Sequence, residues 1–161
     1  MATASRAPAR DAATYLVAAT ATMPAPAERV YGIISDYRAG HPRILPEPYF
    51  SNLRVDEGGT GAGTRFHFDV RAFGRVQTLH SEVTEPVPGR ELVERYPATG
   101  VVTTFRVEPQ PGGGSRVTIE SAMPRRSGVL GTLERLVMSR FLPRLFTEEL
   151  RRLSRVAGER A

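Results

Sequence analysis

The densest group of side chains capable of chemistry in this 161-residue chain lies in the segment Asp36–Pro46. Tyr37, His41 and Arg43 fall within seven residues of one another, between a predicted helix and a predicted strand. Histidine titrates near neutral pH, so His41 can serve as an acid, a base or a hydrogen-bonding group. The alternative role is local: His41 precedes Pro42 and caps a turn, while the arginine is solvated.

Glu94 is the second candidate, because the predicted strand pairing turns its carboxylate inward. A four-residue loop at 97–100 pairs Glu94 with Thr103, and Ser121 of the last strand is expected beside them. An unpaired buried charge is costly, so Glu94 must be paired, protonated or hydrated. Two outcomes stay open: an ion pair with an arginine such as Arg43, or protonation that makes Glu94 a general acid or base. A register shift of one residue would instead turn Glu94 to solvent.

Two further histidines are predicted to face each other on the outer side of a hairpin. A two-residue turn at 73–74 pairs His67 with His80, and Phe68 with Leu79 on the inner face. Two imidazoles can chelate a metal ion, but the sequence shows no third ligand. We therefore interpret them as a surface pair and predict no metal site.

Composition excludes several kinds of chemistry. The chain has no cysteine, which excludes disulfides, thiolate nucleophiles and cysteine metal sites. All 22 basic residues are arginine, and without lysine no Schiff base can form with a carbonyl substrate or pyridoxal cofactor. No Ser/His/Asp arrangement can be assigned, and the glycines at 112–114 lack the strand–helix context of a phosphate-binding loop. We expect no cofactor. The composition is typical of a GC-rich, bacterial genome.

Charge and hydropathy limit the classes of partner and the cellular compartment that we expect. The net charge of +5 is modest, and no basic cluster with stacking aromatics is evident outside the last helix, so we expect no nucleic-acid partner. Residues 1–13 are predicted to be a disordered tail and not a signal peptide. No stretch approaches a membrane span. These features predict a cytoplasmic protein, a monomer or homodimer, without stable membrane insertion.

Seven strands and three helical segments must position these groups. Strand patterns lie at 15–23, 49–57, 65–72, directly after the turn at 73–74, and at 90–96, 101–108 and 117–123. A helix is predicted at about 26–36, and the segment 36–46 is predicted to form a short helix or an irregular turn.

The last segment, from Ser127 to about Val156, is predicted to be one long amphipathic helix. Its apolar residues recur every three to five positions, and arginines mostly occupy the other faces. Packing of the stripe on the sheet is the simpler interpretation, although a basic amphipathic helix can also lie on anionic lipid. Pro143 predicts a kink near Phe141 that splits the helix into two arms. The kink either follows the curvature of the sheet or hinges a lid. The stripe comprises Leu130, Leu133, Val137, Phe141, Leu145, Leu150, Leu153 and Val156.

The order of elements and several short motifs resemble the START-like (SRPBCC) superfamily, and within it the bacterial polyketide cyclase/dehydrase-like group. The matching residues are Met23–Val30, Asp36-Tyr37, Gly61–Thr64, Glu85-Pro86 and Ser115–Ile119. The resemblance covers about residues 14–157. It implies an α+β helix-grip fold: a seven-stranded curved antiparallel sheet, in the order β-α-α-β6-α, around the long kinked helix, in one domain at 14–158. The motifs fix turns and packing and imply no particular reaction.

The resemblance further implies an internal cavity between the sheet and the long helix, with its mouth near the short helices. The predicted ligand-binding residues are Tyr37, Arg43, Phe66, Phe68, Leu79, Tyr96, Thr103, Phe105, Ile119, Ser121, Met123, Val137 and Phe141. The predicted catalytic residues are Glu94 and His41.

Three functional hypotheses follow. The first is binding of a hydrophobic small molecule of the lipid, isoprenoid or aromatic polyketide type. The second is a cofactor-free cyclase or dehydratase that uses the acid and base groups of the cavity. A docking domain for a membrane or a partner is the third. A cavity with only paired Thr, Ser and Arg groups favours a carrier, whereas a carboxylate and an imidazole or phenol on one large cavity favour an enzyme.

Overall fold

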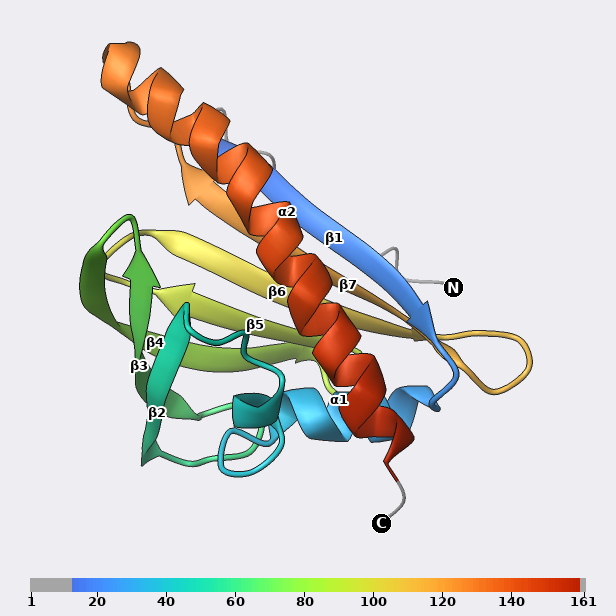
Figure 1. Cartoon of the computed structure of the whole chain (residues 1–161). Helices are drawn as coiled ribbons and strands as arrows, with labels where there is room; N and C mark the ends of the chain where they lie inside the picture. The colour runs from blue at the N-terminus through green and yellow to red at the C-terminus, as the bar shows by residue number, and fades with distance from the viewer. Residues whose placement is uncertain (1–12, 160–161) are drawn as a thin grey trace, which may run out of the picture.

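The computed structural model describes residues 13–159 and contains one antiparallel sheet of seven strands (Figure 1). The spatial order is β1-β7-β6-β5-β4-β3-β2, so β1 and β2 form the two edges. The strands are β1 (Thr14–Met23), β2 (Phe50–Glu57), β3 (Arg65–Ala72), β4 (Arg75–Val87), β5 (Glu91–Tyr96), β6 (Val101–Pro109) and β7 (Ser115–Pro124). The predicted tail at 1–13 lies outside the described residues, except for Ala13.

The segment between β1 and β2 is helical, as predicted. Helix α1 (Ala27–Ser35) follows the N-cap residue Pro26, and its apolar face is buried through residues such as Val30 and Ile34. A single 3-10 turn, η1 (His41–Arg43), comes next. In Figure 1, α1 and η1 lie at the same end of the sheet, beside the C-terminal half of the last helix.

The predicted register of both central hairpins is confirmed. Phe73 and Gly74 both have positive φ, which is the conformation that a tight two-residue hairpin turn requires. Alternating side chains therefore fall on the faces that the sequence pattern indicated. The observed pairs include Arg65 with Glu82, His67 with His80, Phe68 with Leu79, Leu92 with Phe105, Glu94 with Thr103 and Tyr96 with Val101.

Helix α2 (Gly128–Gly158) crosses the inner face of the sheet without a break (Figure 1). The helix is continuous through Pro143, so the proline does not break it, and the kink near Phe141 stays a prediction. A proline removes only one hydrogen bond, the one to the carbonyl of Ser139. Ser139 is exposed, so water can satisfy this carbonyl and the helix continues.

The two halves of α2 differ in burial. Leu150 and Leu153 in the second half are buried in the core. Val129 and Leu130 in the first half are 85% and 82% exposed, and Leu133 is also exposed. The prediction that the whole stripe packs on the sheet is therefore wrong for its first turns. A helix of 31 residues is about 46 Å long, and its start extends past the end of β7 (Figure 1).

Among residues 13–159, no helix has the length and hydropathy needed to cross a membrane.

Candidate functional site

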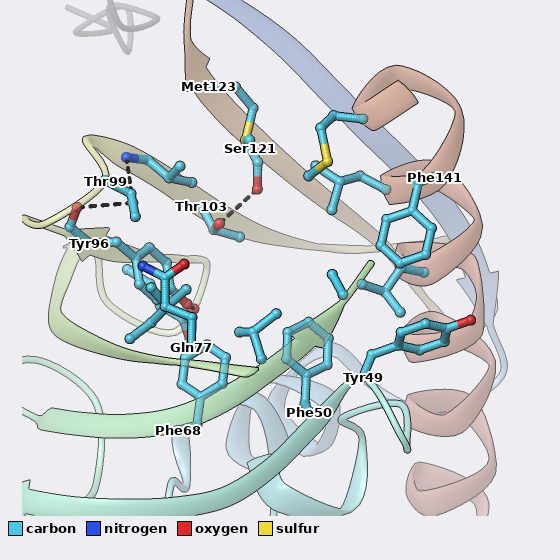
Figure 2. A pocket seen from close by; sticks show the side chains of 18 of the residues that line it. Tyr49, Phe50, Phe68, Gln77, Tyr96, Thr99, Thr103, Ser121, Met123 and Phe141 are labelled. Carbon is cyan, nitrogen blue, oxygen red and sulfur yellow. Dashed lines mark hydrogen bonds between the residues drawn. The ribbon is translucent and has the colours of Figure 1, made fainter. Parts of the chain in front are cut away.

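A cavity of about 610 Å³ lies between the inner face of the sheet and α2 (Figure 2). Its size is in the range typical of small-molecule sites. Most of the wall is aromatic or aliphatic. The apolar lining includes Phe50 from β2, Phe66 and Phe68 from β3, Leu79 from β4, Phe105 from β6, Met123 from β7, and Met138, Phe141, Leu142, Leu145 and Phe146 from α2.

Three aromatic rings from distant segments meet where the cavity reaches the surface. Tyr49 and Phe73 contact Phe141 of α2, with ring centroids 5.3 and 5.8 Å from it. Phe73 lines the cavity and is also 70% exposed, so the cavity opens here. Figure 2 shows Tyr49 and Phe141 side by side at this position.

The polar part of the cavity is organised around Glu94 on β5. Its carboxylate is almost fully buried. The Tyr37 hydroxyl donates to Oε1 over 2.6 Å, and the Tyr96 hydroxyl donates to Oε2 over 2.5 Å. Burial, followed by the charge of Glu94, raises the pKa of both phenols well above the usual value. Both phenols therefore keep their protons and hold the carboxylate in a fixed orientation.

His41 places one ring nitrogen beside this carboxylate. Its Nδ1 lies 2.7 Å from the carbonyl oxygen of Ile34. A carbonyl only accepts hydrogen bonds, so Nδ1 carries a proton and Nε2 is the nitrogen that can gain or lose one. Nε2 is 3.6 Å from Oε1 of Glu94. The ring stacks on Tyr37 with centroids 4.5 Å apart, which fixes its plane.

Glu149 on α2 adds a second carboxyl group to the cavity lining. It is 3% exposed, and its Oε1 has no hydrogen-bond partner among residues 13–159. Burial, and then the charge of Glu94, raises the pKa of Glu149 well above the ordinary carboxyl value. The raised pKa favours the protonated form of Glu149, which can donate a hydrogen bond.

Sequence reasoning missed Glu149, although a signal was present. Glu149 lies four residues after Leu145 and four before Leu153, which places it on the apolar stripe of the helix. A carboxyl at that position is buried once the stripe packs inward.

A hydroxyl pair extends the polar row across the sheet. Thr103 on β6 lies opposite both Glu94 and Ser121 in the strand register. The hydroxyl oxygens of Thr103 and Ser121 are 2.7 Å apart and both residues are buried (Figure 2). The inner faces of β5, β6 and β7 thus carry hydrogen-bonding groups in one line.

The structure brings most of the predicted site residues to this cavity. Those that line it are His41, Phe66, Phe68, Leu79, Glu94, Tyr96, Thr103, Phe105, Ser121, Met123 and Phe141. Tyr37 is fully buried behind Glu94, and Ile119 is part of the core. Lining residues that sequence reasoning did not name include Tyr49, Phe50, Met138, Leu142, Phe146 and Glu149.

Two predicted site residues lie elsewhere, and the alternative in which Glu94 pairs with an arginine is not the arrangement observed. Arg43 pairs at the surface with Glu159, near the end of α2. Val137 belongs to the exposed part of α2 and does not line the cavity. Glu94 contacts two phenols and an imidazole instead of the predicted arginine. The short turn that carries His41 directs this side chain inward and leaves Arg43, two residues later, outside.

A curved antiparallel sheet that holds a long terminal helix over a cavity defines the helix-grip fold. Solved structures of this class match almost the whole chain. The KanY protein is 27% identical, with a TM-score of 0.79 over 91% of this chain and 99% of KanY. The TTHA0849 protein of Thermus thermophilus is 23% identical, with a TM-score of 0.71 over 89% and 97% of the two chains. The Zhui aromatase/cyclase from Streptomyces sp. R1128 is 19% identical, with a TM-score of 0.71 over 89% and 93%.

The family is shown by a direct sequence match. Residues 15–158 match the family described as "Polyketide cyclase / dehydrase and lipid transport", and the chain belongs to it. No curated protein matched the chain. Neighbours below 25% identity support the fold only, so the reaction or ligand must be argued from the cavity.

Proposed function

We propose that this protein binds a largely apolar small molecule that carries oxygen at one end, of the aromatic polyketide type. The observation that carries the proposal is the asymmetry of the cavity. Aromatic and aliphatic side chains form most of its wall, while Glu94, Glu149 and His41 supply buried polar groups. The other charged lining residues, Arg71, Arg75, Arg126 and Glu134, are exposed. The family description, which names both polyketide cyclases and lipid transport, agrees with such a ligand.

The free energies of burial and hydrogen bonding favour an oxygen-bearing ligand over a pure hydrocarbon. Burial of apolar ligand surface contributes roughly 2.5 kcal/mol per 100 Å² and does not distinguish the two. A buried polar group without a partner costs about 1–3 kcal/mol, and Oε1 of Glu149, a residue that lines the cavity, has no partner among residues 13–159. A ligand carbonyl that accepts a hydrogen bond from the protonated carboxyl removes the cost, which corresponds to at least about a fivefold gain in affinity.

A pair of probes tests this proposal. Anthrone and anthracene have similar shape and apolar area, but only anthrone has a carbonyl oxygen. We expect anthrone to bind more tightly, and Glu149→Leu to abolish the preference while keeping anthracene binding. Native mass spectrometry of the protein as purified should also show a bound hydrophobic molecule. Equal affinities of the wild type for both probes, or no binding of either, would contradict the proposal.

A cofactor-free cyclase or dehydratase is the second candidate, favoured by the combination of a proton donor and a proton acceptor on one cavity. In the aldol step, Nε2 of His41 takes a proton from a carbon next to a carbonyl. That carbon forms a bond to a second carbonyl carbon, whose oxygen takes the proton of Glu149. In a second round, His41 again removes a proton from carbon and Glu149 again gives one, so that the new hydroxyl group leaves as water. After each round, a proton returns from the imidazolium of His41 to Glu149. General acid and base catalysis of this kind contributes about 10²- to 10⁴-fold.

Glu149→Gln separates the two candidates. Glutamine keeps the shape and the hydrogen-bond donor but cannot release a proton. If the protein is a cyclase, the variant should bind a linear triketone with an aryl end and lose its dehydrative cyclisation. If the wild type binds this triketone without accelerating its cyclisation, binding alone is the function.

A further inference from the structure

The outer face of the sheet, opposite the cavity, carries three metal-ligating side chains that the proposed function does not use. Asp56 comes from β2, His67 from β3 and His80 from β4. One ligand atom from each lies within 4.8 Å of the others. Nδ1 of His67 is 3.0 Å from both carboxylate oxygens of Asp56, and the two imidazole centroids are 5.2 Å apart.

An irregularity in β2 brings Asp56 into this cluster. The residue before Asp56 pairs with Phe66 of β3 and the residue after it pairs with Arg65, so Asp56 is an extra residue between two paired positions. Such a bulge redirects the side chain relative to a regular strand. His67 and His80 lie directly opposite each other in the next pair of strands. The sequence predicted the histidine pair, and the bulge supplies the third ligand that the sequence did not show.

We propose that Asp56, His67 and His80 bind a divalent transition-metal ion of the zinc class. Two imidazole nitrogens and one carboxylate oxygen suit Zn²⁺ and its neighbours, whereas Mg²⁺ and Ca²⁺ favour oxygen ligands alone. Ligand atoms about 2.0–2.1 Å from a tetrahedral ion are about 3.4 Å from one another. The cluster is close to this spacing, and rotation of the exposed side chains closes the remaining gap. Three protein ligands leave the fourth position to water.

The surroundings allow an ion to enter. Asp56 and His80 are exposed and His67 is half-buried. Two arginines are close in the register. Arg54 lies opposite His67 but is exposed, so its guanidinium group can point to solvent. Arg65 already lies within ion-pair distance of two carboxylates on the neighbouring strands.

A bound ion would join the edge strand to the body of the sheet. Among the strands, β2 pairs only with β3, and its register is interrupted twice. Phe50, at the start of β2, lines the cavity. The ion would therefore stabilise one wall of the cavity from the outside, and because it binds only the folded arrangement it would raise the melting temperature.

Calorimetric titration with zinc chloride, using protein without a histidine tag and treated with a chelator, tests the site. We expect one ion per chain and a rise in melting temperature on zinc addition. Co²⁺ should give the visible absorption bands of a tetrahedral complex. His80→Ala and Asp56→Asn should each weaken zinc binding at least about tenfold. Both positions are exposed, so these variants should fold, and far-ultraviolet circular dichroism verifies this.

Glu82→Gln is the matched control. Glu82 lies two residues along β4 from His80, so it is on the same face, and the substitution removes a negative charge without removing a ligand. Its zinc affinity should stay within about twofold of the wild type. Zinc binding that is equal in the wild type and His80→Ala, or a wild type that binds no zinc, would overturn the proposal. Equal weakening by Glu82→Gln would do the same, since it would indicate unspecific attraction by surface charge.

Discussion

Glu149 on α2 and Glu94 on β5 line the same cavity but differ in how their carboxyl oxygens are hydrogen-bonded. Glu94 accepts a hydrogen bond from a phenol at each oxygen, whereas Oε1 of Glu149 has no partner among the described residues. The charge of Glu94 is one of the two causes that raise the pKa of Glu149, after burial. The two carboxyls therefore differ in their surroundings, and those of Glu149 favour its protonated form.

Glu149→Gln should remove a pH dependence from the stability of the fold. Because the folded-state pKa of Glu149 is raised, the unfolded chain loses this proton at a lower pH than the folded chain. The free energy of unfolding is thus highest below the ordinary carboxyl pKa. It falls as pH rises towards the folded-state pKa, by at most about 1.4 kcal/mol per pH unit. Urea unfolding at about pH 5 and about pH 8 should show this loss in the wild type and a smaller loss in the variant. Parallel pH profiles would contradict this assignment.

Tyr37→Phe and Tyr96→Phe should each destabilise the protein. Each substitution removes one of the two O–H donors to the buried carboxylate of Glu94, at a cost of about 1.5–3 kcal/mol. Tyr49→Phe removes an exposed phenol from the same cavity and should change stability by less than about 0.5 kcal/mol. Denaturant unfolding measures all three variants. If all three change stability equally, the hydrogen bonds to Glu94 are not the cause.

Pro143→Ala should stabilise the protein without altering ligand exchange. The substitution restores the amide that the continuous helix lacks at this position, and alanine is favoured over proline within a helix by up to about 3 kcal/mol. Thermal unfolding measures the gain. Stopped-flow dissociation of anthrone should give an unchanged rate, because the helix is unbroken at Pro143. A markedly slower release would support the alternative in which this proline serves a moving lid.

The two halves of α2 should differ sharply in their tolerance of substitution. Leu133→Ser, in the exposed first half, should change the free energy of unfolding by less than about 0.5 kcal/mol. Leu153→Ala, in the buried second half, should cost about 2–5 kcal/mol. Urea unfolding of both variants makes the comparison. A large loss from Leu133→Ser would mean that the first half of α2 is covered in solution.

The strand pairing was predictable because alternation and turn length constrain each other. The two-residue turn at 73–74 and the four-residue loop at 97–100 each allow one register that keeps apolar residues on one face. This reasoning was sufficient to place Glu94, Thr103 and Ser121 together.

Other features depend on relationships that a periodic pattern does not contain. The position of Asp56 depends on an extra residue in β2, and alternation alone assigns such a residue to the wrong neighbours. The exposed start of α2 depends on the length of the helix relative to the sheet. The partners of Glu94 depend on how the segment between β1 and β2 packs on the sheet, because Tyr37 and His41 arrive from this distant segment.

Strand β3 serves two surfaces at once. Phe66 and Phe68 face the cavity, while His67 between them faces outward to Asp56 and His80. Point substitutions can therefore alter the cavity and the exterior of the sheet separately. The insertion or deletion of a single residue in this strand would exchange the two sets of side chains, placing an imidazole among the rings of the cavity and a benzyl group in water.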